Sequence, residues 1–274
     1  MLGQSINNNC NFIELQSFLM EATQSIVGCP KDISKFAGFN YYEQKDINTD
    51  YKCCPQLSYV PQHIILPHCS FKVINELLCS QEVHAFKKIY SQLIKQVMAR
   101  NAVQLKFKSD INGIKRASIY DYQLAFYLFS KIFPYLETTK IIDGELYIAC
   151  QLNPLLRFIE YQHNNSLVPH YDTAVRINDN IVSASTVIFY FTNNTLGKTR
   201  IINESVKNPH NIHNDEILYQ ISPAPGKCII FDHNIFHDSS QFHKTEPQED
   251  NKLILTTEIL YYKLSEKHKT QLNF

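Results

Sequence analysis

The sequence predicts an α+β fold, with helices in its first half and β-strands in its second. Apolar residues recur at helical spacing over residues 71–99 and 117–133, which is typical of helices with one buried face. From Glu145 onward the chain contains runs rich in β-branched and aromatic residues, as expected of strands. A chain of 274 residues with 44% hydrophobic content is long enough to bury a full core.

Three helical segments are expected in the first half. Residues 12–27 are amphipathic and are followed by Gly28 and Pro30, which terminate helices. In residues 71–99 the apolar positions that carry the helical spacing are Val73, Leu77, Leu78, Phe86, Ile89, Leu93 and Val97. In residues 117–133, which stop before Pro134, they are Tyr120, Leu124, Tyr127 and Leu128.

Four strands are expected in the second half, at residues 156–161, 186–193, 228–231 and 252–262. No internal repeat or low-complexity linker divides the sequence. We therefore expect one main domain over residues 86–264, preceded by an N-terminal extension over residues 1–85 that packs on or near the core. The charged end of the chain, residues 265–274, is expected to be a flexible tail.

A candidate metal site lies among these strands. His170 and Asp172 are two residues apart, so both side chains project from the same face of an extended strand. His237 follows the apolar run 228–231, whose predicted strand would end near the same place. Two imidazoles and one carboxylate leave coordination positions open, the arrangement of non-haem Fe(II) oxygenases, and zinc accepts the same ligands.

Five short motifs occur in order around these residues. They are L-R-F-x-x-Y at residues 156–161, H-x-D at 170–172, T-x-x-x-Y-L-N, loosely matched, at 186–193, G-G-x-T-R-F at 196–201 and P-x-x-G-x-x-x-x-F-D-H-x-x-x-H at 223–237. In this series the chain resembles the prolyl 4-hydroxylase-like branch of the Fe(II)/2-oxoglutarate-dependent dioxygenases. The resemblance covers about two fifths of the chain, from residue 153 to residue 262.

The resemblance implies both a fold and a chemistry. The fold is a double-stranded β-helix, or jelly-roll, core with N-terminal helices that buttress one sheet. The implied cofactor is Fe(II), held by His170, Asp172 and His237, with 2-oxoglutarate as co-substrate and ascorbate as an aid to activity. The implied reaction hydroxylates a C–H bond and releases succinate and CO2. The expected substrate is a protein side chain, with proline as the first candidate, or a small molecule.

Departures from the family pattern concern the co-substrate. A sixth signature, K-Y-x-L-R-T-D, has Thr256 in place of its arginine, and Leu196 replaces a glycine of the fourth. A basic residue on this closing strand grips the distal carboxylate of 2-oxoglutarate in the family. We expect Lys252 to be that anchor, with Thr256 as a hydroxyl donor beside it. Tyr161 stands where the family places a tyrosine that reaches the co-substrate, although a core tyrosine is equally compatible. Arg200, expected in a structural ion pair, is the second choice of anchor.

Other functions remain open. Loss of the arginine would suit a catalytically inactive jelly-roll binding module that keeps the metal site, although retention of three metal ligands argues against it. A zinc hydrolase with the same ligands would need a nearby general base, and the sequence has no H-E-x-x-H helix to provide it. His233, four residues before His237, is expected to support the site at its edge rather than to bind the metal.

Composition argues against several classes of partner. Lys plus Arg equals Asp plus Glu at 26 each, so no overall basic field indicates nucleic-acid binding. Residues 1–20 lack the basic start and continuous apolar core typical of a signal peptide, and the sequence contains no apolar run of about 18 residues, so we expect no membrane partner. Its eight cysteines lack the spacing of a disulfide scaffold, which favours reduced thiols and a cytoplasmic location.

Overall fold

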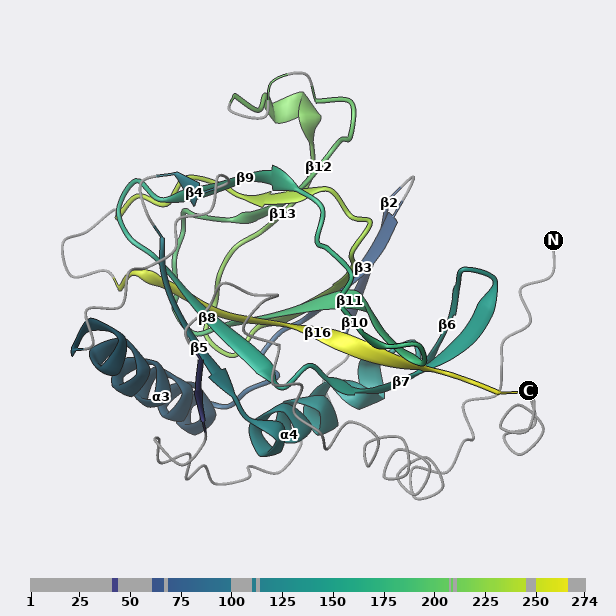
Figure 1. The fold of residues 1–274 in the computed structure, drawn as a ribbon. Helices are drawn as coiled ribbons and strands as arrows, with labels where there is room; N and C mark the ends of the chain where they lie inside the picture. Colours follow the sequence, from purple (N-terminus) through teal and green to yellow (C-terminus); the bar gives the residue numbers. More distant parts are fainter. Residues whose placement is uncertain are drawn as a thin grey trace.

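The computed structural model describes residues 41–43, 61–66, 69–99, 110–111, 114–206, 208, 211–244 and 250–265. Over these residues two β-sheets face each other, and two helices cover the outer side of the larger sheet (Figure 1). The helix expected at residues 12–27 and all but the first residue of the expected tail lie outside the described residues.

The larger sheet contains eleven strands. Its central path runs through β1 (Tyr41–Glu43), β5 (Lys115–Tyr120), β8 (Leu155–Tyr161), β16 (Lys252–Lys263), β11 (Ile181–Tyr190), β14 (Cys228–Asp232), β3 (Cys69–Ile74) and β2 (Gln62–Leu66). Three more strands join it at β16 and β11, namely β6 (Thr139–Ile142), β7 (Glu145–Leu152) and β10 (Arg176–Asn178).

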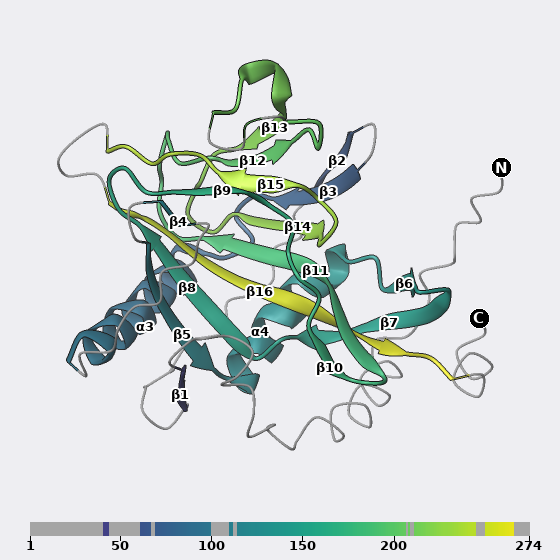
Figure 2. The same ribbon diagram turned by 45° about the horizontal axis from the view of Figure 1, so that its top comes forward.

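The smaller sheet contains five strands, in the order β13 (Ile217–Ile221), β12 (Thr199–Ile202), β15 (His237–Ser239), β9 (Ser166–His170) and β4 (Asp110–Ile111). From β8 onward the chain passes repeatedly between the two sheets. β8, β11, β14 and β16 belong to the larger sheet, and β9, β12, β13 and β15 belong to the smaller one (Figure 2). This alternation is the double-stranded β-helix, so the expected jelly-roll core within an α+β fold is confirmed.

Apolar side chains from both sheets fill the space between them. The cluster includes Ile188, Ile229 and Ile254 from the larger sheet and Ile201 and Ile221 from the smaller one. Each large apolar side chain buried in this way contributes roughly 1.5–3 kcal/mol relative to exposure. The few polar side chains that also face inward, such as Lys252 and His237, are exceptions in this largely apolar space.

Two helices pack on the opposite face of the larger sheet. α3 (Ser80–Ala99) and α4 (Tyr122–Ile132) contribute Phe86, Leu93 and Leu128 to a second apolar cluster that also contains residues of β8, β11 and β16. α4 begins at Asp121, whose carboxylate accepts a hydrogen bond from the Leu124 amide at 2.9 Å. A short 3-10 turn, η2 (Phe133–Tyr135), follows α4 directly, and a second one, η3 (Asn214–Glu216), precedes β13. The expected buttressing role of the helices is confirmed.

The predicted starts of both helical regions were wrong. Residues 69–74 form strand β3, in which Phe71 and Val73 are buried and pair with β14, so the alternation of period two prevailed over the helical spacing. Residues 115–120 likewise form β5, paired with β8, and the helix begins only after its Asp121 cap. In both places the apolar residues fit the helical spacing and the strand alternation equally well. Pairing with a neighbouring strand is what makes these residues a strand.

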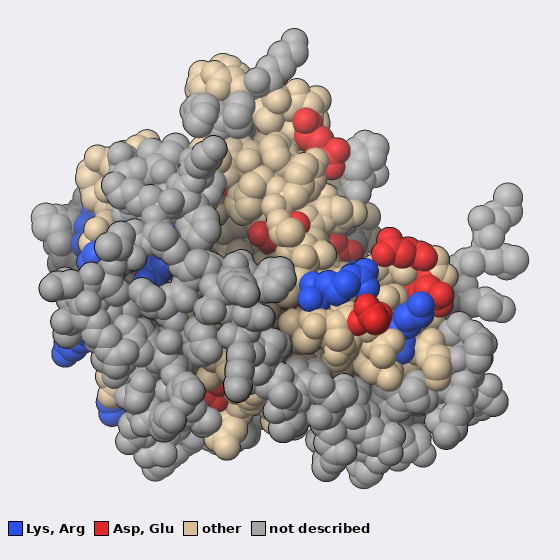
Figure 3. All heavy atoms as spheres, in the orientation of Figure 1, with Lys and Arg blue, Asp and Glu red and all other residues tan. Residues whose placement is uncertain are grey.

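The four predicted strands form as β8, β11, β14 and β16, with β11 starting earlier and ending earlier than expected. The domain boundary at residue 85 stays a prediction; β2 and β3, which precede it, are strands of the larger sheet. Within the described part of the chain, no helix has the length and apolar character needed to cross a membrane. On the face drawn in Figure 3, described basic and acidic side chains lie next to each other at the right, and those at the left edge are basic.

Candidate metal centre

Two histidines face each other across neighbouring strands of the smaller sheet. His170 ends β9 and His237 begins β15, and the two are direct partners in the antiparallel ladder. Their ring centroids are 4.4 Å apart. Each ring is held by its own chain, because Nδ1 of His170 lies 2.9 Å from the Val168 carbonyl and Nδ1 of His237 lies 2.9 Å from the Ile235 carbonyl. A hydrogen bond to a carbonyl requires the proton on Nδ1, which leaves both Nε2 lone pairs free to bind a metal.

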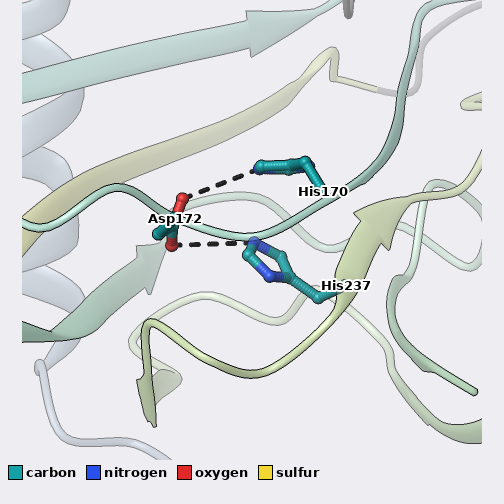
Figure 4. Close-up of side chains that lie close together, drawn as sticks. All are labelled: His170, Asp172 and His237. Carbon is teal, nitrogen blue, oxygen red and sulfur yellow. Dashed lines mark ion pairs between the residues drawn. The ribbon is translucent and has the colours of Figure 1, made fainter. Parts of the chain in front are cut away.

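Asp172 completes the group from just beyond the end of β9. Its carboxylate oxygens lie 3.6 Å from Nε2 of His170 and 3.8 Å from Nε2 of His237 (Figure 4). The Thr186 hydroxyl of β11 donates a hydrogen bond to the same carboxylate at 2.5 Å. The ladder of one sheet therefore sets the two imidazoles, and a hydroxyl from the other sheet orients the carboxylate.

The charges of the three groups suit a cation. Burial would raise the pKa of the Asp172 carboxyl, but His237, the Thr186 hydrogen bond and His170 outweigh it and hold this pKa below its ordinary value. Burial lowers the pKa of His237 to about 4, against the opposing effect of Asp172. At neutral pH the group therefore offers a carboxylate and a neutral imidazole, the forms that bind metal ions.

The spacing of the ligand atoms also fits a divalent ion. One ligand atom from each of the three residues lies within 4.8 Å of the others. Ligand atoms at about 2.1 Å from a common ion are about 3 Å apart when they subtend right angles, so the observed spacing needs only a small contraction. All three ligands can bind one ion and still leave positions for other molecules.

Lys252 lies inside the barrel, fully buried, at the start of β16. Its ammonium donates a hydrogen bond to the Ser239 hydroxyl at 2.7 Å and lies 4.4 Å from the centroid of the Tyr161 ring, which faces it across the β8–β16 ladder. Among the described residues it forms no ion pair with a carboxylate, and its hydrogen bond is to Ser239. Burial accordingly lowers the pKa of Lys252 to about 7, although Asp238 acts in the opposite direction. A buried ammonium that lacks a carboxylate is suited to bind the carboxylate of a ligand.

The other predicted co-substrate residues have different surroundings. Thr256 lies four residues farther along β16, opposite Arg157 and Ile188, so the hydroxyl next to Lys252 is that of Ser239. Arg200 forms a bidentate ion pair with Asp238. Tyr161 is 1% exposed and belongs to the core between the sheets, as well as contacting Lys252. Which of these residues contact a co-substrate stays a prediction.

His233 lies outside the group of three ligands but close to its charge. The side chain is 8% exposed, and Asp172 and Glu258 act to raise its pKa, although burial prevails and lowers it. This position agrees with a supporting place at the edge of the site.

Sequence reasoning missed several polar residues that face the site. Ser239 was missed because a single hydroxyl has no distinctive spacing. Thr186 begins the third motif, but its hydrogen bond to Asp172 was not predicted. Arg157 and Glu258 were also missed, although both lie within recognised motifs; their ion pair joins β8 to β16 and appears only when the strand register is known. The sequence signal that could have identified Arg157 and Glu258 is a charged residue within a strand that is otherwise largely apolar.

No protein-family model matches the chain, and no curated protein sequence matches it. Solved structures do resemble it. The viral collagen prolyl hydroxylase of Paramecium Bursaria Chlorella virus-1, as a 2OG complex, is 14% identical with a TM-score of 0.44, over 70% of this chain and 96% of that chain. A prolyl-4-hydroxylase of Pseudomonas putida is 12% identical with a TM-score of 0.42, over 72% of this chain and 94% of that chain.

HygX from Streptomyces hygroscopicus, with nickel and 2-oxoglutarate bound, is 10% identical with a TM-score of 0.42, over 70% of this chain and 82% of that chain. Identities and TM-scores at this level establish neither the family nor the activity of this chain. The jelly-roll fold follows from its own sheet topology, and the case for function depends on its own side chains.

Proposed function

We propose that the protein is an Fe(II)- and 2-oxoglutarate-dependent oxygenase that hydroxylates a C–H bond and releases succinate and CO2. The observation that carries the proposal is the convergence of His170, Asp172 and His237 in a barrel that also holds the buried Lys252. Among the described residues, this lysine has no ion pair with a carboxylate. A two-histidine, one-carboxylate site with open positions is typical of non-haem Fe(II) oxygenases. The five ordered motifs of the sequence support the same assignment.

The residues of this chain divide the work between them. His170, Asp172 and His237 would hold Fe(II), and Thr186 fixes the orientation of the Asp172 carboxylate. Lys252 would bind the distal carboxylate of 2-oxoglutarate as a point charge, with the Ser239 hydroxyl beside it. Bound iron and 2-oxoglutarate together supply the oxidation of a substrate C–H bond, coupled to decarboxylation of the co-substrate.

The family signature binds the distal carboxylate with an arginine at the position of Thr256, four residues farther along the strand. Burial of Lys252 explains how a lysine could bind that carboxylate instead. Lys252 is 0% exposed, so water does not screen its charge and an arriving carboxylate gains a strong interaction. The alternative of an inactive binding module was based on the loss of the signature arginine. Because Lys252 can supply a positive charge in its place, that argument is weaker. The proposed substrate is a protein side chain, with proline first, or a small molecule, and the proposed location is the cytoplasm.

Succinate release tests the proposal. Purified protein with Fe(II), ascorbate and 2-oxoglutarate in air is expected to release succinate above the level of the His170→Ala variant. Equal and negligible release by both proteins, in a wild-type sample that has bound iron and has been offered prolyl peptides, would favour the binding module. Loss of release in His170→Ala with normal folding, checked by circular dichroism, would support the oxygenase.

A further inference from the structure

A second basic residue, Arg157, faces the space between the sheets near the metal ligands. Arg157 of β8 lies opposite Thr256 of β16, and two residues along β16 Glu258 lies opposite Thr186 of β11. Directly opposite residues share one face of a sheet, as do residues two apart on a strand. Thr186 donates its hydrogen bond to Asp172, so this face is the one turned toward the metal ligands.

Arg157 and Glu258 form an ion pair on that face. The carboxylate of Glu258 is well supplied with donors, because Arg157 binds Oε1 and the Asn153 amide binds Oε2 at 2.8 Å. Arg157 is in the opposite position. Its guanidinium carries five N–H groups, and among the described residues it makes a hydrogen bond only to Glu258. The pair therefore presents unused donors, but its acceptors are already engaged.

The location of these donors indicates what could use them. The two histidine ligands belong to the smaller sheet, while Arg157 and Glu258 belong to the larger one. A molecule bound at the open positions of the metal must lie between the two sheets. The Arg157 side chain is 18% exposed, against 7% for Glu258, so the guanidinium is the more accessible member of the pair.

We propose that Arg157 is a second anion-binding residue of this site and takes a carboxylate that lies between the sheets beside the metal. The planar guanidinium can form two parallel hydrogen bonds to a carboxylate, which a lysine cannot. The carboxylate can belong to the metal-side end of the co-substrate or to the substrate that is oxidised. The inference rests on the proposed function, because it places the ligand next to the same metal site.

A purely structural ion pair would respond differently to substitution. If Arg157 and Glu258 served only to join β8 to β16, removing either charge would damage the site in the same way. An anion-binding Arg157 is partly neutralised by Glu258, so removing the Glu258 charge strengthens anion binding while removing the Arg157 charge weakens it. The two variants Arg157→Gln and Glu258→Gln therefore change anion binding in opposite directions if the anion lies at Arg157, whereas a purely structural ion pair predicts a loss in both.

The experiment uses two probes on the full chain, with thermal melting to check folding. Calorimetric titration of metal-free protein with glutarate, a dicarboxylate without a keto group, tests the co-substrate as the source. Titration of Mn(II)-loaded protein with N-acetylglycine, at saturating 2-oxoglutarate and without oxygen, tests a separate substrate. Arg157→Lys serves as the matched control that keeps the charge.

Arg157→Gln is expected to weaken binding of one probe at least tenfold, Arg157→Lys less, and Glu258→Gln to tighten it. Loss confined to glutarate assigns the carboxylate to the co-substrate, and loss confined to N-acetylglycine assigns it to the substrate. The proposal is overturned if Arg157→Gln leaves both affinities unchanged, if Glu258→Gln weakens binding equally, or if wild type binds neither probe. Failure of wild type to bind Mn(II) would instead contradict the proposed function, and the glutarate titration of metal-free protein would still test Arg157.

Discussion

His170 and His237 are direct partners across the β9–β15 ladder, and their ring centroids are 4.4 Å apart. Strand pairing thus brings together two residues that are 67 positions apart in the sequence. His170 ends β9, and His237 begins β15, the neighbour of β9 in the sheet. Since each Nδ1 is engaged by a carbonyl of its own chain, both rings direct Nε2 toward Asp172 before any metal arrives. Strand pairing and the two carbonyl hydrogen bonds therefore preorganise the two imidazoles for metal binding.

Replacing His237 with Ala is expected to lower the affinity for divalent metal more than a hundredfold, because one of three ligands is lost. His233→Ala is the matched control, since His233 is buried nearby but lies outside the ligand group. We expect its metal affinity to stay within about threefold of wild type. Equilibrium dialysis with Co(II) or Mn(II) measures both, and a larger loss in His233→Ala than in His237→Ala would reverse the ligand assignment.

Thr186→Val is expected to lower metal affinity roughly 10- to 100-fold, as found for residues that orient a metal ligand. The change removes the hydroxyl that donates to Asp172 but keeps the shape of the side chain. Thr257→Val is the control. Thr257 lies on the face of β16 turned away from the metal ligands, and its hydroxyl donates a hydrogen bond to the Asn153 carbonyl. Equal metal affinities in the two variants would show that the Thr186 hydrogen bond does not position Asp172.

Lys252→Met is expected to weaken 2-oxoglutarate binding about 10- to 100-fold while leaving metal affinity intact. A hydrogen bond to a charged group is worth about 1.5–3 kcal/mol, which corresponds to that range. Lys263→Met is a suitable control, since Lys263 lies at the far end of the same strand and pairs with Glu145. Unchanged 2-oxoglutarate affinity in Lys252→Met would leave Arg200 as the next anchor to test.

The same substitution is expected to stabilise the protein without ligand in a pH-dependent way. Burial lowers the pKa of Lys252 to about 7 in the folded protein, whereas an unfolded lysine titrates near its ordinary value of about 10.4. Between these values the unfolded chain binds more protons, so the free energy of unfolding rises with pH and the destabilisation is greatest below pH 7. Lys252→Met should therefore exceed wild type in stability at pH 6, and the gap should narrow by pH 10. Urea denaturation measures this, and a gap that widens with pH would contradict it.

Arg200→Met is expected to destabilise the fold by about 3–5 kcal/mol, because it leaves the Asp238 carboxylate buried without its partner. Metal and 2-oxoglutarate affinities of the folded fraction should change little if the ion pair only joins β12 to β15. Denaturation and ligand titration on the same sample separate the two effects. A selective loss of 2-oxoglutarate affinity, with stability unchanged, would identify Arg200 as an anchor instead.

The sequence predicted the parts of this molecule that depend on local pattern. The strands at residues 228–231 and 252–262 were predicted because continuous apolar runs mark buried strands, and α4 because its apolar face repeats at helical spacing. His170, Asp172 and His237 could be singled out because their residue types and motif order are distinctive.

What the sequence could not predict depends on long-range pairing. Phe71 and Val73 fit a helix as well as a strand, and only the partner strand β14 decides between them. The Ser239 hydroxyl beside Lys252 and the Arg157–Glu258 pair each join strands distant in sequence, so their contacts exist only once the sheet register is set. Local spacing contains no information about that register.

Water-proton relaxation of Mn(II)-loaded protein tests the central claim most directly, because it reports both the ion and its open positions. We predict one Mn(II) per chain, a fall in relaxation enhancement when 2-oxoglutarate displaces water from the ion, and loss of Mn(II) binding in Asp172→Ala. Mn(II) that binds as tightly to Asp172→Ala as to wild type, or whose bound water is unaffected by saturating 2-oxoglutarate, would contradict the account.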